Sequence, residues 1–289
     1  MLYGAIEAGG TKMVCGIGTE TGEILDRVSI PTRTPDETMP EIVSFFKDKE
    51  IVALGLACFG PIDLHKDSAT YGYITSTPKT AWIDYDIVGY LKKELNVPIG
   101  FDTDVNGSLL GEVTWGCGKG LSDVVYITVG TGIGGGVMSG GKLLHGMLHP
   151  EVGHILMRRY PEDNYAGKCP FHKDCFEGLA AGPAIEERWG CKAIELADKD
   201  EVWELESKYI AQAIVNYMMT LSPQKIILGG GVMHQEQLFP LIRKKVLEMN
   251  AGYIKTKELE NIDQYIVPAS LNDNQGIMGA VKLGMDAVE

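Results

Sequence analysis

The sequence predicts an α/β protein built from two similar lobes. Its 289 residues exceed the size of one typical hydrophobic core. Short apolar stretches typical of strands alternate along the chain with stretches of helical spacing. The order strand, glycine turn, strand and tight reversal occurs near residue 8 and again near residue 131. We therefore expect an N-terminal lobe (1–117), a C-terminal lobe (118–275) and a final segment (276–289) that packs back on the first lobe.

Composition narrows the class of protein. Hydrophobic content of 45% and charged content of 22% are ordinary for a globular chain. The formal charge of −13 argues against a nucleic-acid binder, which needs a basic face. The longest apolar-leaning run, 51–62, is too short to span a bilayer, so no membrane association is expected. The N-terminus lacks a signal-peptide pattern, which predicts a cytoplasmic protein whose six cysteines serve as thiols and metal ligands.

The first 30 residues predict three strands, 4–8, 13–18 and 23–30. The first two are joined by Gly9-Gly10-Thr11-Lys12. Backbone N–H groups, the threonine hydroxyl and the lysine ammonium of such a turn can all point at a phosphate. A glycine hairpin also forms without any ligand, so this motif alone leaves both interpretations open.

The next elements lead to a second candidate region. A helix is expected over 36–50 and a buried strand over 51–60, which ends at Gly60-Pro61, a turn where a ligand could meet backbone. A helix follows around 87–95, and then a strand over 97–101.

That strand runs into Asp102-Thr103-Asp104-Val105-Asn106, which opens another helix. Asp and Asn at a helix start can be explained as caps. One Asp would suffice for a cap, however, and ligands of α/β sheets are usually met at the carboxyl ends of strands. Asp104 is therefore a candidate catalytic residue, with helix capping as the alternative.

The second half repeats the pattern. Strands are expected at 123–130 and 137–138, around the glycine turn 131–136, with a reversal at 139–141. These turns link strand to strand, which disfavours a Rossmann fold, and the P-loop pattern does not occur in the sequence. Later in the chain, helices are expected from 182 onward and over 202–220, and a strand over 225–233 runs into three glycines against which a ring or a ribose could lie. A late strand is expected over 265–270 and a closing helix over 276–288.

The stretch between these parts holds a candidate metal site. Cys169, His172 and Cys175 have the spacing C-x2-H-x2-C, and His154 lies a loop away. Zinc takes four such ligands tetrahedrally, and four protein ligands leave no position for a water, so the zinc should be structural. The alternative is a polar loop that gathers these side chains by chance. Two carboxylates, Glu151 and Glu177, adjoin the site, and the metal would fix their direction.

Taken together, these motifs resemble the ROK family of sugar kinases, in the actin/hexokinase-like superfamily, and in particular its bacterial fructokinases. The motifs span nearly the whole chain: IEAGGTK (6–12), FGPID (59–63), TPKTAW (77–82), DTDVNGSLLGE (102–112), VGTGIGGG (129–136), HPEVGHI (149–155), CPFHKDCFEGLAAGPAI (169–185) and ILGGGV (227–232). The resemblance implies a two-lobed, actin-like (ribonuclease H-like) ATPase fold with an interlobe cleft and a zinc-bound loop.

The resemblance also implies roles. Asp104 matches the catalytic base that takes the hydroxyl proton as a hexose attacks the γ-phosphoryl of ATP. Mg²⁺ would bridge the phosphates and so let an acidic chain bind ATP. Three further sets match. The ATP-binding set is Gly9, Gly10, Thr11, Lys12, Thr131, Gly132, Gly134, Gly229, Gly230 and Gly231. The hexose-binding set is Gly60, Pro61, Asp104, Glu151, His154 and Glu177. The metal set is His154, Cys169, His172 and Cys175.

Three departures qualify the match. Many members have Asp in place of Glu7, which leaves open whether Glu7 helps to hold Mg²⁺-bound water. Glucose-specific members commonly carry a sugar-contacting Asn at Pro78-Lys79, and many members have a cysteine-richer metal loop. Both of these departures favour D-fructose, giving D-fructose 6-phosphate, over the alternatives of a glucokinase, a mannokinase or another hexose kinase.

Two non-enzyme alternatives remain. Sugar-sensing repressors of the family carry a helix-turn-helix before the sugar fold, whereas here the phosphate turn begins at Gly9. A catalytically dead sugar-binding protein is disfavoured by the intact Asp104 and both phosphate turns. The resemblance further suggests a homodimer.

Overall fold

The computed structural model describes residues 1–288, which form two compact units. The first comprises Met1–Gly120, the segment His145–His149 and the chain from Ser270 onward; the second comprises Leu121–Leu144 and Pro150–Ala269. The chain thus changes unit close to the expected residues 117 and 275, and a short segment from the middle of the sequence belongs to the first unit. Among residues 1–288, no helix combines the length and hydropathy needed to cross a bilayer.

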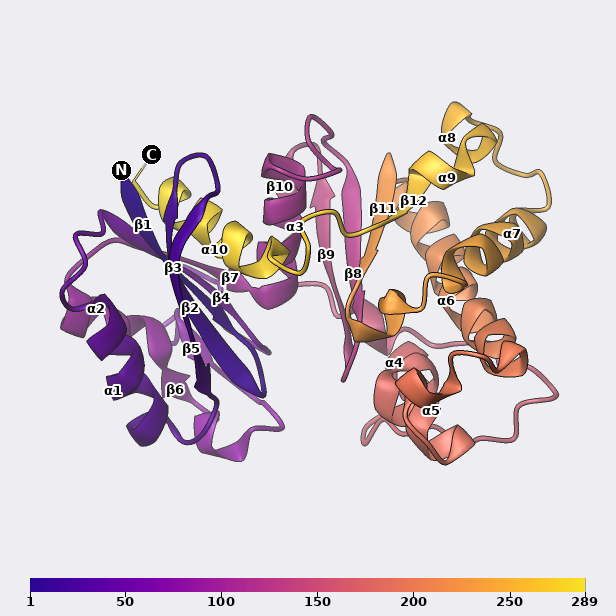
Figure 1. The fold of residues 1–289 in the computed structure, drawn as a ribbon, viewed down its shortest axis with the longest axis horizontal. Helices are drawn as coiled ribbons and strands as arrows, with labels where there is room; N and C mark the ends of the chain where they lie inside the picture. Colours follow the sequence, from indigo (N-terminus) through magenta and orange to yellow (C-terminus); the bar gives the residue numbers. More distant parts are fainter. Residues whose placement is uncertain (289) are drawn as a thin grey trace. The chain divides into compact units, whose positions relative to one another are not determined.

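The first unit is organised around a five-stranded sheet of order β3-β2-β1-β4-β7 (Figure 1). Its strands are β1 (Leu2–Ala8), β2 (Lys12–Thr19), β3 (Ile24–Pro31), β4 (Ala53–Cys58) and β7 (Ile99–Thr103). The first three are antiparallel, whereas β1, β4 and β7 run parallel to one another. The three strands predicted at the N-terminus are confirmed, because their alternation and turn residues are local signals.

Helices cover both faces of this sheet. Helices α1 (Pro35–Phe46) and α2 (Ile87–Leu95) bury their apolar sides in a core shared with β1 and β4. Helices α3 (Asp104–Thr114) and α10 (Gln275–Asp286) pack against each other, and α10 contacts β1, β4 and β7. The approach of α10 is so close that a Cβ on Gly55 would stand 1.7 Å from the Ala280 carbonyl oxygen. Glycine is therefore required there.

The second unit contains a sheet of the same design, of order β10-β9-β8-β11-β12. Its strands are β8 (Val124–Val129), β9 (Ile133–Ser139), β10 (Lys142–Leu143), β11 (Lys225–Gly229) and β12 (Ile266–Pro268). Strands β8, β9 and β10 are antiparallel, and β8, β11 and β12 are parallel. Strand order and strand directions therefore match those of the first unit, which confirms the predicted internal repeat.

The core of the second unit is formed largely by α6 (Asp200–Leu221), the long helix predicted from its periodicity, together with β8 and β11. The other α-helices are α4 (Phe176–Ala180), α5 (Gly182–Trp189), α7 (Leu238–Asn250), α8 (Lys257–Glu260) and α9 (Ile262–Tyr265). A 3₁₀ turn, Gly231–His234, separates the three glycines from α7. Helices α4, α8 and α9 were not predicted from the sequence, nor was the two-stranded sheet of β5 (Tyr73–Ile74) and β6 (Tyr85–Asp86) in the first unit.

Candidate functional site

The carboxyl ends of three parallel strands meet at one edge of the first sheet. Ala8 of β1 is in register with Cys58 of β4, and Cys58 with Thr103 of β7. The residues that follow these strand ends include the first glycine turn, the Gly60-Pro61 turn and Asp104. Three of the predicted sites therefore lie along the edge where α/β sheets usually meet their ligands.

Asp104 is the first residue of α3, and it is not the cap. The cap is Thr103, whose hydroxyl oxygen accepts a hydrogen bond from the Asn106 N–H at 3.1 Å. The Asp104 carboxylate accepts from the Val105 N–H at 2.9 Å and is half-buried. The partial positive charge at a helix start favours an ionised carboxylate. Neither aspartate is the N-cap residue, although Asp104 does satisfy one free N–H at the helix start, and its catalytic role stays a prediction.

The first glycine turn is a tight loop fixed from outside. The Gly9 N–H donates to the Lys12 carbonyl at 3.0 Å, and the Thr32 hydroxyl donates to the Gly9 carbonyl at 2.7 Å. Thr11 and Lys12 are exposed. Lys79 was not predicted at this turn, yet its Cε lies 3.5 Å from the position that a Cβ on Gly10 would take. Two lysines therefore lie at the turn proposed to meet phosphate.

Glu7 lies just before this turn and is largely enclosed by protein. A Cβ on Gly276, in the first turn of α10, would stand 2.3 Å from its Oε1 atom. Burial raises the pKa of Glu7 above its ordinary value, while the positive charges of Arg27 and Lys12 oppose that rise. The carboxylate thus packs against the start of α10, and its part in metal binding stays open.

The Gly60-Pro61 turn contacts the segment 145–149. The Gly60–Pro61 peptide bond is cis, and the Ile62 N–H donates to His149 Nε2 at 3.3 Å. A Cβ on Gly60 would stand 3.3 Å from the His149 ring. This contact could not be predicted from local patterns, because the partners are 87 residues apart.

In the second unit, the two predicted nucleotide turns are neighbours. The Gly130 N–H closes the 130–132 turn on the Gly132 carbonyl at 2.9 Å. A Cβ on Gly130 would lie 3.8 Å from the backbone nitrogen of Gly231, at the end of β11. Gly230 has a φ of +89°, and a Cβ there would stand 2.5 Å from the Val129 carbonyl oxygen, so only glycine fits. The parallel ends of β8 and β11 therefore bring these turns together.

The two predicted carboxylates lie beside the first of these turns. Glu177 Oε2 accepts a hydrogen bond from the Ile133 N–H at 2.9 Å, which ties α4 to the start of β9. Partial burial raises the pKa of Glu151, although the residue keeps an exposed face, and the charge of Glu177 adds to the rise. Glu177 is therefore bonded to the residue that follows the 130–132 turn and lies near enough to Glu151 to affect its pKa, while a shared sugar site stays a prediction.

The four predicted metal ligands are brought together. The ligand atoms of His154, Cys169, His172 and Cys175 all lie within 4.8 Å of one another. His154 Nδ1 is 3.8 Å from Cys169 Sγ and 3.5 Å from Cys175 Sγ, and His172 Nδ1 is 3.8 Å from Cys169 Sγ. Tetrahedral zinc with bonds of about 2.3 Å to sulfur and 2.0–2.1 Å to nitrogen requires N···S separations of about 3.6 Å. The geometry therefore fits a zinc ion.

Backbone pairing explains why these ligands converge. Cys169 and Lys173 exchange hydrogen bonds that close a hairpin around His172, with Lys173 at a φ of +58°. The Phe176 N–H then donates to the Ile155 carbonyl at 3.1 Å, which places Cys175 beside His154. The metal loop is thus continuous with α4, which carries Glu177.

Comparison with known proteins finds relatives that match over the full length of the chain. A fructokinase of Pediococcus pentosaceus is 46% identical over 289 residues, covering 100% of this chain and 99% of that protein. A fructokinase of Streptococcus mutans serotype c is 42% identical over 287 residues, covering 98% and 97%.

Solved structures show the same fold. A ROK hexokinase from Thermus thermophilus superposes with a TM-score of 0.81 at 23% identity, covering 100% of this chain and 99% of that chain. A ROK family glucokinase from Streptomyces griseus, in complex with glucose and AMPPNP, gives 0.75 at 22% identity, covering 99% and 100%. The ROK family model matches residues 3–287. The chain is therefore a member of the ROK family.

Proposed function

We propose that the protein is an ATP-dependent hexose kinase that converts D-fructose to D-fructose 6-phosphate. The observation that carries the proposal is the position of Asp104, at the same sheet edge as the Gly9–Lys12 turn, in a chain 40–46% identical to several fructokinases. A positioned carboxylate and a phosphate-binding turn are the two parts that phosphoryl transfer to a hydroxyl requires.

Asp104 acts as the general base. Its carboxylate orients the attacking hydroxyl of the hexose and accepts the proton as the oxygen attacks the γ-phosphorus of ATP. The bond between the γ-phosphorus and the bridging oxygen to the β-phosphate breaks, and ADP leaves. Its place in the first turn of α3 supports this role, because the partial positive charge at a helix start favours an ionised carboxylate, the form that can accept a proton. A positioned base of this kind contributes about 10²- to 10⁴-fold to rate.

The glycine turns bind the nucleotide. Gly9, Gly10, Thr11 and Lys12 of the first unit bind phosphate, as do Thr131, Gly132 and Gly134 of the second unit, and Gly229, Gly230 and Gly231 line the adenosine. The contact of Gly130 with Gly231 supports one continuous nucleotide surface in the second unit. Mg²⁺ bound with ATP would neutralise phosphate charge, which the acidic chain as a whole does not.

The hexose is held by Gly60, Pro61, Asp104, Glu151, His154 and Glu177. Carboxylates suit sugars because each can accept hydrogen bonds from two hydroxyl groups. The cluster of His154, Cys169, His172 and Cys175 holds a structural zinc that braces these side chains. His154 faces the cysteine sulfurs through Nδ1, so its Nε2 is the atom that meets the sugar.

A panel assay tests the substrate. ATP-coupled turnover is measured with fructose, glucose, mannose and amino sugars, because specificity between hexoses depends on a few hydroxyl contacts. The proposal predicts the highest kcat/KM for fructose. A higher value for glucose or mannose would make the protein a glucokinase or mannokinase, while no turnover of any hexose would contradict the kinase assignment.

We also propose that the protein is a homodimer, as the family resemblance suggests. Exposed apolar side chains near the metal loop support a second copy as partner, since Leu156 is 82% and Phe171 is 78% exposed. Sedimentation analysis would show twice the chain mass of 31.5 kDa if this is correct.

A further inference from the structure

We propose that His145 is a positioning residue for phosphoryl transfer, which acts through Asp102 to hold the turn that carries Asp104. The proposal rests on the proposed role of Asp104 as the base. His145 touches neither substrate nor reacting atoms in this assignment, and the sequence motifs did not single it out.

Asp102 braces the Asp104 turn from both sides. The Asp102 side chain is buried, with 4% of the residue exposed, at the end of β7. Its Oδ1 atom accepts from the Thr103 N–H at 2.8 Å and from the Asn106 side-chain amide at 2.6 Å. Thr103 precedes Asp104 and Asn106 lies two residues after it, so one carboxylate oxygen fixes both flanks of the base.

His145 engages the other oxygen of the same carboxylate. Its Nε2 atom lies 2.9 Å from Asp102 Oδ2, and 3.4 Å from the Asn106 amide nitrogen. A carboxylate oxygen only accepts, so the short contact to Asp102 requires a proton on Nε2. A buried carboxylate is costly unless it is hydrogen-bonded and paired with a positive charge. The protonated imidazole of His145 supplies both to Asp102.

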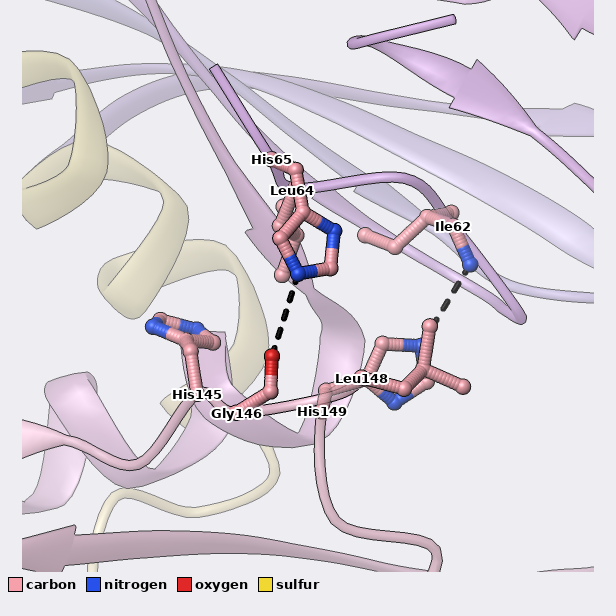
Figure 2. A pocket seen from close by; sticks show the side chains of 7 residues that line it. All are labelled: Ile62, Leu64, His65, His145, Gly146, Leu148 and His149. Carbon is pink, nitrogen blue, oxygen red and sulfur yellow. Dashed lines mark hydrogen bonds between the residues drawn. The ribbon is translucent and has the colours of Figure 1, made fainter. Parts of the chain in front are cut away.

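Two further contacts fix the segment that carries His145 (Figure 2). His65 Nε2 lies 3.0 Å from the Gly146 carbonyl oxygen, and His149 Nε2 accepts from the Ile62 N–H. Between these contacts is a cavity of about 230 Å³, lined by side chains that include Leu64 and Leu148. The segment 145–149 is therefore anchored at His145, Gly146 and His149, and the His145 anchor reaches the base turn.

The proton on the imidazole makes this brace dependent on pH. The hydrogen bond that His145 donates to Asp102 raises the pKa of His145 above its ordinary value of 6.5, against the opposing effect of partial burial. The other titratable groups around this pair are Tyr71, whose pKa is raised by burial and by the charge of Asp102, and His65 and His149, which line the same cavity.

The direction of the pH effect follows from the raised pKa. A histidine whose folded pKa is raised contributes fully at low pH, and its contribution is lost as pH rises through the folded pKa. The charged pair should therefore hold the base turn at pH values below the folded pKa of His145 and weaken as pH rises through that pKa. We expect the wild-type kcat to show an alkaline decline that follows the His145 titration.

Two substitutions of His145 separate charge from the hydrogen bond. His145→Gln keeps a neutral N–H donor at the reach of Nε2, so kcat near neutral pH should stay within about 3-fold, with the alkaline decline absent. His145→Ala removes the donor, and loosening of the base should lower kcat by about 10- to 100-fold, with a much smaller change in the KM for ATP. The matched control is His65→Gln, which alters the neighbouring anchor but not Asp102, and should keep kcat within about 2-fold with the alkaline decline intact.

The assay uses the full chain and the hexose that the panel turns over fastest, with thermal unfolding of each variant measured in parallel. A His145→Gln enzyme that keeps the wild-type alkaline decline would overturn the proposal. So would a folded His145→Ala enzyme with kcat within 2-fold of wild type. If His145→Ala does not fold, the His145→Gln profile decides alone.

An NMR titration of the six histidines separates this inference from the proposed function. The His145 resonance, identified by its loss in His145→Gln, should titrate above pH 6.5, and its pKa should fall in Asp102→Asn. A titration unchanged by Asp102→Asn would refute the pair whatever the enzyme's substrate. Conversely, normal turnover by Asp104→Asn would refute the base while leaving the measured His145–Asp102 pair intact.

Discussion

Replacing Glu177 tests whether this carboxylate supports the second glycine turn as well as the sugar. Its Oε2 atom accepts the Ile133 N–H at 2.9 Å, at the first residue of β9. Ile133 is 4% exposed, so water has little access to that N–H once its partner is gone. Glu177→Ala removes the acceptor, whereas Glu177→Gln retains a carbonyl oxygen of the same reach without the charge.

The expected size of the effect follows from this one hydrogen bond. Leaving a buried backbone donor without a partner costs about 1–3 kcal/mol. At 1.36 kcal/mol for each factor of ten, that is a loss of about 5- to 150-fold in kcat/KM if the turn must be ordered to bind ATP. The same energy lowers Tm by about 2–4 °C per kcal/mol in domains of this size.

Steady-state kinetics and thermal unfolding measure these effects. Both Glu177 variants should raise the KM for the hexose, because both change the sugar contact. Only Glu177→Ala should also raise the KM for ATP and lower Tm. Glu186→Ala, on the exposed side of α5, is the control and should leave both unchanged. If Glu177→Ala and Glu177→Gln show the same ATP KM and the same Tm, the support of the turn by Glu177 is refuted.

Three further predictions concern the metal, a buried acid and a turn. Purified protein should contain about one zinc per chain. Cys175→Ser should lose the zinc, whereas the control Cys191→Ser should retain it. Elemental analysis that finds no zinc in active protein would contradict the site. Burial raises the pKa of Glu206 well above its ordinary value, so the native protein loses stability as pH rises above that ordinary value. Glu206→Gln should therefore raise Tm at about pH 8 and have little effect at about pH 4. A Tm gain that does not grow with pH would count against this role of Glu206. Gly230→Ala, at a φ of +89° and against the Val129 carbonyl, should weaken ATP binding at least about 10-fold, and an unchanged ATP KM would refute the role of that turn.

The repeated architecture could be predicted because its signals are local. Apolar strands, glycine turns and helical periodicity each span a few adjacent residues, and they predicted most of both sheets and the long α6 helix. Elements of two to five residues, such as β5 and α4, carry too few positions for a period to be visible.

The parts of the candidate site that have local sequence signals could be predicted, and the parts that depend on distant residues could not. The metal ligands could be predicted because three lie within seven residues, and the structure brings all four together. The contacts that position the site residues could not be predicted from the sequence. His145 meets Asp102 across 43 positions of sequence, and Lys79 approaches Gly10 across 69, so both depend on the completed fold. The interpretation of Asp102 as a helix cap was wrong for this reason, since its true partners are Asn106 and a distant histidine.

The most direct test of the central claim is turnover by Asp104→Asn with fructose and Mg-ATP. Asparagine keeps the size of the side chain and cannot accept the hydroxyl proton as a carboxylate does. The account predicts a fall in kcat of at least about 100-fold, with fructose binding still measurable by calorimetry. Near-normal turnover by Asp104→Asn would contradict the assignment of the base and, with it, the proposed mechanism.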